Sequence, residues 1–300
     1  MTGSSVRPSI SGTVPSPPSP ERIEELERIA AQVRRDILRM VFMAQSGHPG
    51  GSLGCADFMT ALFFEVMNIQ PDAFDMDGIG EDIFILSNGH ISPVYYSVLA
   101  RRGYFPISEL ATFRKIDSRL QGHPATQENL PGIRIATGSL GQGLSVAVGA
   151  SLAKRLHRDP HLVYCLQGDG ELQEGQNWEA YTFAAHHTID NLITVIDYNL
   201  RQIDGNLPQI MSLGDLHQRL KAIGWYVLEM DGHNLAEIIY TLRHAQRLTG
   251  RKRPIAIIMH TVMGKGVDFM EGDHRWHGTP PNEEQFKRAI IQLPETLGDF

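Results

Sequence analysis

Short apolar runs alternate with longer segments of helical periodicity along most of the chain. The apolar runs have the length of buried strands and cover residues 83–86, 162–166, 192–196, 225–229 and 255–259. The helical patterns lie at about 52–66, 93–101, 143–154, 174–186, 213–223 and 234–247. Parallel strands need long crossover connections, which intervening helices supply. The sequence therefore predicts an α/β fold, a parallel sheet with helices on both faces.

The start of the chain differs in composition from the rest. Residues 1–20 are rich in Ser and Pro and have few large apolar side chains, so we expect a disordered leader. Ser19 and Pro20 suit the N-cap and the first position of a helix, and apolar spacings of three and four continue to Val41. Because no linker or internal repeat follows, we expect residues 21–300 to form one domain.

Charge and cysteine content argue against several classes of protein. The chain has 27 basic and 34 acidic residues and a formal net charge of −7, so neither nucleic acid nor an anionic membrane is an expected partner. No apolar run approaches the roughly 18 residues of a membrane span, and no secretory signal is visible. Cys55 and Cys165 stand alone in apolar stretches, which indicates buried thiols and a cytoplasmic location.

Two long segments lack any periodicity. Residues 119–137 and 263–285 are both rich in Gly and Pro. A structureless loop of about 20 residues in a compact domain is usually functional or disordered. The pairs His123-Pro124 and His277-Gly278 lie in these segments and favour a functional role.

The strongest chemical signal is Gly168-Asp169-Gly170, directly after the strand predicted at 162–166. In a parallel sheet, ligands bind beyond the carboxyl ends of the strands. Asn199 follows the next strand, so the oxygens of Asp169 and Asn199 should converge. Such a pair, with positions left for phosphate and water, describes a Mg²⁺ site. Either motif alone would equally suit a tight turn or a helix cap.

Two other patterns carry less weight. Gly141-Gln142-Gly143 resembles the start of a dinucleotide-binding loop, but the third glycine is missing and the preceding strand is poor. A nicotinamide enzyme is therefore not expected. His186 and His187 lie in the middle of a predicted helix without a metal-binding spacing, and we interpret them as solvated or packing residues.

Taken together, the motifs resemble the thiamin-diphosphate enzymes, and specifically transketolase. The stretch from Gly168 to Asn199 is similar to the fingerprint of the wider group. The motifs typical of transketolase are SGHPG at 46–50, SNGH at 87–90, GHP at 122–124, TGSLGQG at 137–143, GDGELQEG at 168–175, Glu179-Ala180 and His277-Gly278. They follow the family order from about residue 30 to 280. The resemblance covers only the diphosphate-binding domain of that family.

The resemblance implies a site for thiamin diphosphate and a divalent metal. Asp169, Asn199 and the backbone carbonyl of Arg201 would bind Mg²⁺, or Ca²⁺ or Mn²⁺ in its place. The residues implied in cofactor binding are His90, Gly138, Leu140, Gly168, Asp169, Gly170, Glu174, Asn199 and His277. Ser139 and Arg201 depart from the proline and the aliphatic residue usual at these positions, so the local packing should differ there.

Four histidines match the active-site histidines of the family. Cleaving a C–C bond of a ketose needs a proton removed from a hydroxyl near neutral pH, which suits imidazole. The resemblance implies that His48 and His277 transfer this proton and that His123 binds a donor hydroxyl. It also places His90, with His277, near the diphosphate. A single histidine would be read as a packing residue, but four in loops beside Gly or Pro indicate catalysis.

Glu174 and Glu179 allow two interpretations. They match family carboxylates that lie near the subunit interface and connect the cofactor sites. They also suit the start of a helix, where a carboxylate interacts favourably with the helix dipole. The sequence alone leaves both open.

These features identify the sequence as a member of the transketolase family and predict the diphosphate-binding subunit of a split enzyme. Such an enzyme transfers a two-carbon ketol unit from a ketose to an aldose, commonly sugar phosphates. The resemblance implies a partner subunit with the pyrimidine-binding domain, in an α₂β₂ arrangement, and a default role in the pentose phosphate pathway. The alternatives are a two-oxo-acid dehydrogenase α chain, a deoxyxylulose-phosphate synthase, for both of which the histidine motifs fit less well, and a non-catalytic homologue.

Overall fold

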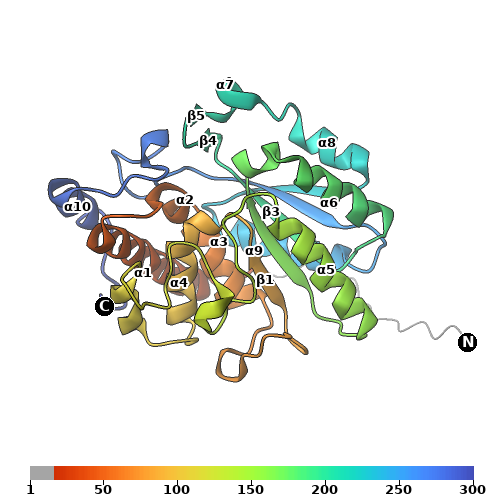
Figure 1. Cartoon of the computed structure of the whole chain (residues 1–300), viewed down its shortest axis with the longest axis horizontal. Coiled ribbons are helices and arrows are strands. Elements are labelled where there is room, and N and C mark those ends of the chain that lie inside the picture. Colours follow the sequence, from red (N-terminus) through yellow and green to blue (C-terminus); the bar gives the residue numbers. More distant parts are fainter. Residues whose placement is uncertain (1–16) are drawn as a thin grey trace, which may run out of the picture.

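The sheet at the centre of the molecule has five parallel strands (Figure 1). The structure is a computed structural model and describes residues 17–300, so most of the predicted leader lies outside the described residues. The strands, in spatial order, are β1 (Ile83–Leu86), β2 (Val163–Gly168), β3 (Leu192–Tyr198), β7 (Ile255–His260) and β6 (Tyr226–Asp231). All neighbouring pairs are parallel. The predicted sheet and its five strands are confirmed.

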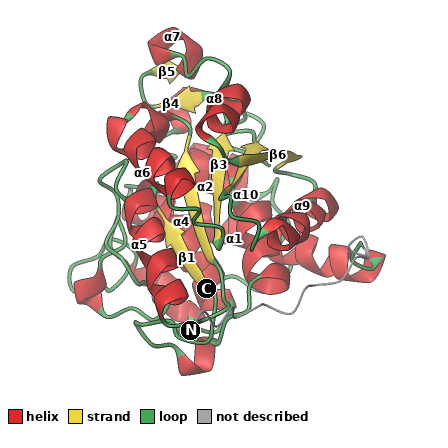
Figure 2. Cartoon of the chain, turned by 90° about the vertical axis from the view of Figure 1, so that its right-hand side faces the viewer, coloured by secondary structure: helices red, strands yellow, loops and turns green. Residues whose placement is uncertain are grey.

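Helices pack against both faces of the sheet, as predicted (Figure 2). One face is covered by α1 (Pro20–Ala44), α3 (Ala56–Ala61), α4 (Ser92–Arg101) and α9 (Leu235–Leu248). The other face is covered by α5 (Gly143–Leu156), α6 (Gly175–His186) and α8 (Leu216–Ile223). Alternation along each strand sends neighbouring side chains to opposite faces, so Ile85 joins one apolar cluster and Leu86 the other. Both faces of the sheet are therefore buried against helices, which explains why the strands are unbroken apolar runs in the sequence.

The first long helix begins where the sequence predicts. The hydroxyl of Ser19 accepts a hydrogen bond from the backbone N–H of Arg22 at 3.3 Å, and Pro20 occupies the first turn. Inside the helix, the buried carboxylate of Asp36 pairs with Arg101 of α4 at 2.5 Å. In the described part of the chain, no helix is both long enough and apolar enough to cross a membrane. Cys55 and Cys165 are free and buried, as expected.

Some predicted helix boundaries are wrong. The segment predicted as one helix over 52–66 starts earlier and is divided into α2 (Pro49–Gly54), α3 and a π-helical turn, Leu62–Val66. Its start tolerates Pro49 because a first-turn residue needs no N–H donor. The helix predicted from 213 begins three residues later, because Gly214 takes a φ of +65° and Asp215 caps Leu216–Ile223.

Four short elements were not predicted. They are α7 (Leu207–Met211), α10 (Glu283–Ile290) and a two-stranded antiparallel hairpin, β4 (Arg201–Gln202) with β5 (Gly205–Asn206). The start of α10 carries a full capping box between Asn282 and Gln285, a signal that the sequence did contain. The hairpin immediately follows Asn199, so it shapes the loop beyond β3.

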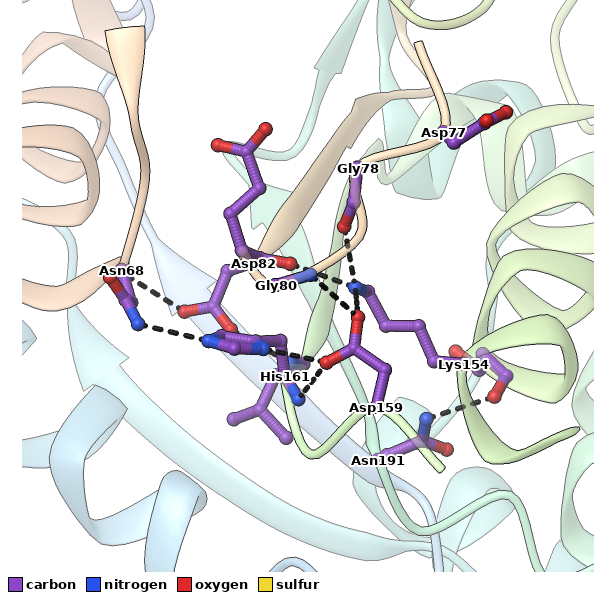
Figure 3. Close-up of polar contacts among 12 residues, drawn as sticks. Asn68, Asp77, Gly78, Gly80, Asp82, Lys154, Asp159, His161 and Asn191 are labelled. Atoms are coloured by element: carbon purple, nitrogen blue, oxygen red, sulfur yellow. Dashed lines mark hydrogen bonds and ion pairs between the residues drawn. The ribbon is translucent and has the colours of Figure 1, made fainter. Parts of the chain in front are cut away.

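A polar network fixes the loop before β1 at the amino edge of the sheet (Figure 3). The buried ammonium of Lys154 donates to the carbonyl oxygens of Gly78 and Glu81 and pairs with Asp159 at 2.7 Å. His161 Nδ1 lies 2.6 Å from the other oxygen of Asp159. Burial alone would raise the pKa of Asp159, but the hydrogen bonds from Lys154 and His161 outweigh it and lower the pKa well below its usual value. This network therefore fixes the chain segments before β1 and β2 at the amino edge of the sheet.

Candidate active site

Asp169 and Asn199 lie in adjacent loops at the carboxyl edge of the sheet. Gly168 and Asp197 are register partners, so the ends of β2 and β3 are level. The two carboxylate oxygens of Asp169 accept backbone hydrogen bonds from Gly170 at 2.7 Å and from Leu200 at 2.6 Å. The second bond joins the Asp169 carboxylate directly to the loop of Asn199. The structure therefore brings together the two side chains that the sequence predicted to converge.

Asp197 is a neighbour whose contribution the sequence analysis missed. Its buried carboxylate accepts a hydrogen bond from the Asn199 amide nitrogen at 2.9 Å and another from the hydroxyl of Thr261. This arrangement fixes the Asn199 amide, whose oxygen accepts from the backbone N–H of Arg201 at 2.8 Å. Asp197 could have been suspected only from its place at a strand end two residues before Asn199.

The electrostatics of this edge suit a cation. Burial, followed by the charge of Asp197, raises the pKa of Asp169 to about 8. Among the described residues, no Lys or Arg forms an ion pair with either carboxylate, so the protein supplies no cation to balance them once they are ionised. Within residues 17–300 there is no metal-ready group of three His, Cys, Asp or Glu side chains. A divalent metal here would take carboxylate, amide and backbone oxygens and complete its shell with a ligand.

Glu171 is a second residue that the analysis missed. It is 2% exposed, and its carboxylate accepts hydrogen bonds from the backbone N–H groups of Gly141 at 2.9 Å and Gly168 at 3.1 Å. The hydroxyl of Ser87 donates a third bond to it. One side chain thus joins three motifs that are far apart in sequence. Its position inside the GDGELQEG motif was visible, but its partners depend on the folded arrangement.

Glycines allow the loops around this edge to approach one another. A Cβ at Gly138, where φ is +119°, would lie 2.5 Å from Cδ2 of His123. A Cβ at Gly89 would lie 2.5 Å from Oγ1 of Thr137. Because real Cβ atoms do not approach this closely, side chains at these two positions would push the loops apart.

The structure gathers the four predicted histidines into one cluster. The ring centroid of His48 is 5.1 Å from that of His90, 5.7 Å from that of His277 and 6.2 Å from that of His123. The rings of His90 and His277 are 5.0 Å apart. They come from four different loops, and the two long unassigned segments supply His123 and His277.

These histidines are held in the neutral form. Burial, and after it the charge of His277, lowers the pKa of His48 to about 4. Burial also lowers the pKa of His123 and His277, and that of His90 well below its usual value. The Nδ1 atoms of His48 and His277 are buried and have no hydrogen-bond partner among the described residues. A neutral imidazole has one unprotonated ring nitrogen, which can accept a proton and return it.

The remaining predicted residues surround this cluster at different depths. Leu140 is partly exposed in the same loop as Gly138, and Glu174 contacts Gly141 of that loop, where a Cβ would lie 2.8 Å from Cβ of Glu174. Glu179 is exposed on α6. The side chain of Arg201 donates to the carbonyl oxygen of Gly272 at 2.7 Å and so connects the loop after β3 with the segment that carries His277.

The chain is similar in sequence to proteins of one known family. The family model described as "Transketolase, thiamine diphosphate binding domain" matches residues 26–294. The chain is 37% identical to an apulose-4-phosphate transketolase subunit of Phocaeicola vulgatus, covering 92% of this chain and 96% of that protein. It is 39% identical to the 6-deoxy-6-sulfo-D-fructose transketolase subunit SqwG of a Clostridium species, covering 90% and 96%.

Full-length relatives are matched over less than half of their length. The crystal structure of transketolase from Campylobacter jejuni superposes with a TM-score of 0.83 at 35% identity, covering 90% of this chain and 43% of that one. Human transketolase is 35% identical over 92% of this chain and 43% of its own length. The chain therefore matches the relatives named as subunits over nearly their whole length and corresponds to one part of the longer proteins.

Proposed function

The chain belongs to the transketolase family, and we propose that it is the thiamin-diphosphate-binding subunit of a split enzyme. The enzyme transfers a two-carbon ketol unit from a ketose, such as a sugar phosphate, to an aldose. The observation that carries this proposal is the cluster of four neutral histidines at the same sheet edge as Asp169 and Asn199. The dehydrogenase, synthase and non-catalytic alternatives lose support because the matched relatives are transketolases.

The cofactor and metal would lie across the ends of β2 and β3. Asp169, Asn199 and the backbone carbonyl of Arg201 would hold the metal, most simply Mg²⁺, with Ca²⁺ or Mn²⁺ able to replace it. The uncompensated carboxylates of Asp169 and Asp197 fit that role. Thiamin diphosphate, when bound, supplies the electron sink that ketol transfer needs.

The other proposed cofactor contacts come from the loops around this metal site. Gly168 and Gly170, which lack side chains, would let the backbone approach the diphosphate closely. The remaining proposed contacts are Gly138, Leu140, Glu174, His90 and His277.

The histidines perform the proton transfers. His48 and His277 are neutral at pH 7 and can take a proton from a donor hydroxyl and return it to the acceptor product. His123, which is exposed at the mouth of the cluster, would hydrogen-bond a donor hydroxyl. His90 lies closer to the sheet, beside His277, where it would contact the diphosphate end of the cofactor.

A partner subunit completes the site in this proposal. Two of the relatives that match over 96% of their length are named as subunits, which supports a second chain bearing the pyrimidine-binding domain. We propose an α₂β₂ assembly, with the exposed Glu174 and Glu179 near a subunit contact. The buried free thiols suit a cytoplasmic enzyme, and the pentose phosphate pathway is the default setting.

The test is to tag this chain in its own cells, purify it gently and assay the assembly for ketol transfer. We expect a partner protein to copurify in stoichiometric amount, and we expect ketol transfer to require it. A preparation that is active without a partner protein would contradict the proposal of a split enzyme. In the assembly, Asp169→Ala should abolish Mg²⁺-dependent binding of thiamin diphosphate. Asp72→Ala, at an exposed carboxylate far along the chain, is the matched control. Normal cofactor binding by the Asp169 variant would remove the metal assignment.

A further inference from the structure

Arg114 is a cationic side chain beside the histidine cluster with no role in the reaction described so far. It follows the helical turn Ile107–Thr112 and adopts a φ of +58°, a left-handed conformation that is unusual for arginine. Its backbone N–H donates to the carbonyl oxygen of Leu120 at 2.9 Å, which closes a loop of the chain. The turn directs the side chain back toward Gly122, immediately before His123.

The guanidinium lies against the backbone of Gly122. A Cβ at Gly122 would overlap Cζ of Arg114 and lie 2.5 Å from one of its terminal nitrogens. The backbone there is fixed from α4, because Ser92 donates to the carbonyl oxygen of Gly122 and Tyr96 to that of Gln121, both at 2.8 Å. The backbone beside the guanidinium is therefore fixed by α4.

The guanidinium of Arg114 lies over the ring of Phe113, 5.6 Å from its centroid, but it has no charged partner in the described part of the chain. Among residues 17–300, no carboxylate or carbonyl oxygen accepts a hydrogen bond from the side chain of Arg114, whose Nε is buried and unpartnered. Its terminal nitrogens keep contact with solvent, since only Nε is among the buried unpartnered atoms. Arg119, five residues later in the same loop, shows the contrast, because it pairs with Glu109 at 2.7 Å. A half-buried guanidinium with an aromatic ring but no acceptor oxygen beside it lacks the hydrogen bonds that buried charges usually have.

The charge of Arg114 is directed at the proposed donor site. Burial, and after it the charge of Arg114, lowers the pKa of His123. For His48, burial and the charge of His277 are the larger causes and Arg114 follows them. The other titratable group that affects Arg114 is the phenol of Tyr96, and burial lowers the pKa of Arg114 itself. No acidic side chain acts on it among the described residues.

We propose that Arg114 is a donor-binding residue whose terminal N–H groups hydrogen-bond an oxygen of the ketose held by His48 and His123. This inference rests on the proposed transketolase function and extends it to a residue outside the predicted site. A guanidinium presents a planar fork of donors that stays charged at every working pH, which suits two neighbouring oxygens of a polyhydroxylated substrate. It would also keep a hydroxyl oxygen oriented while a neighbouring histidine removes its proton.

The test compares variants of the assembled enzyme, with its partner and cofactor. Arg114→Met removes the donors, Arg114→Lys keeps the charge but not the fork, and Arg119→Met is the matched control. We expect Arg114→Met to lower kcat/KM for the ketose donor about 10- to 100-fold, the loss typical of a hydrogen bond to a charged group. Arg114→Lys should recover part of it. Thiamin-diphosphate affinity, the acceptor KM and the melting temperature should stay unchanged.

The pH profile adds a readout that packing would not move. Without the neighbouring positive charge, the pKa of His48 and His123 should rise, so the acidic limb of donor kcat/KM moves to higher pH in Arg114→Met only. A donor kcat/KM within twofold of wild type, or equal losses in donor use, cofactor affinity and thermal stability, would overturn the proposal. If the wild-type assembly itself transferred no ketol unit, the proposed function would fail first and this assignment with it.

Discussion

The carboxylate of Glu171 offers a direct test of how the cofactor loops are held together. Glu171→Gln keeps the shape of the side chain but replaces one acceptor oxygen with an N–H donor. One oxygen can still accept from Ser87 and Gly141, but the amide nitrogen then faces the N–H of Gly168. A lost hydrogen bond to a charged group and a buried donor left unpaired cost about 2–4 kcal/mol together.

The expected result is a fall in melting temperature of about 5–10 °C, because 1 kcal/mol shifts a domain of this size by a few degrees. Affinity for the thiamin diphosphate–Mg²⁺ pair should fall as well, since Gly168 precedes Asp169. Differential scanning calorimetry and cofactor titration measure the two effects. Glu27→Gln, at an exposed position on α1, is the control. A Glu171→Gln protein that melts within 1 °C of wild type would refute the reasoning.

Three further perturbations address other parts of the molecule. Gly138→Ala should leave the fold intact but lower the rate of ketol transfer at least tenfold, because the new Cβ would collide with His123. A steady-state assay measures this rate. Wild-type activity would show that the loop relaxes and avoids the collision. The lowered pKa of His48 means that this group is protonated in the unfolded chain before the folded one, so it lowers stability as the pH falls from 6.5 to about 4. Asp169, whose pKa is raised to about 8, contributes with the opposite sign over the same range. Denaturant titrations should therefore show a steeper loss of stability in the wild type than in His48→Gln, and equal slopes would contradict the neutral cluster. Lys154→Met should destabilise the chain by about 3–5 kcal/mol while cofactor affinity, measured by titration, stays constant. A parallel loss of affinity would show that the two sheet edges are coupled.

The sequence predicted those parts of the fold that depend on local pattern. The run at 83–86 became β1 (Ile83–Leu86) with the same bounds, because a strand buried on both faces must be apolar throughout. The helix over 52–66 was misjudged, because periodicity does not reveal that it starts at Pro49 or that its last turn is π-helical. The cap of α10 was readable but lay inside a segment without periodicity.

The site was predictable only where residue types and the resemblance pointed to it. Asp169 and Asn199 follow from strand ends that must be neighbours, whereas the meeting of His48, His123 and His277 came from the resemblance. Two residues, Glu171 and Arg114, could not be identified from the sequence. The hydrogen bonds of Glu171, and the lack of an acceptor oxygen for Arg114 among residues 17–300, depend on loops that approach each other only in the folded chain, so no spacing along the sequence encodes them.

The network of Lys154, Asp159 and His161 bears on laboratory evolution of the enzyme. It fixes the start of β2, whose six residues span about 20 Å at the usual rise of a strand. Substitutions separated by more than about 10 Å and sharing no partners contribute to stability nearly independently. Stabilising mutations at this edge could therefore be selected first. Libraries of variants in the histidine loops could then be built on that background. Mutations in those loops that change the substrate preference usually lower stability, and the first set would compensate for the loss.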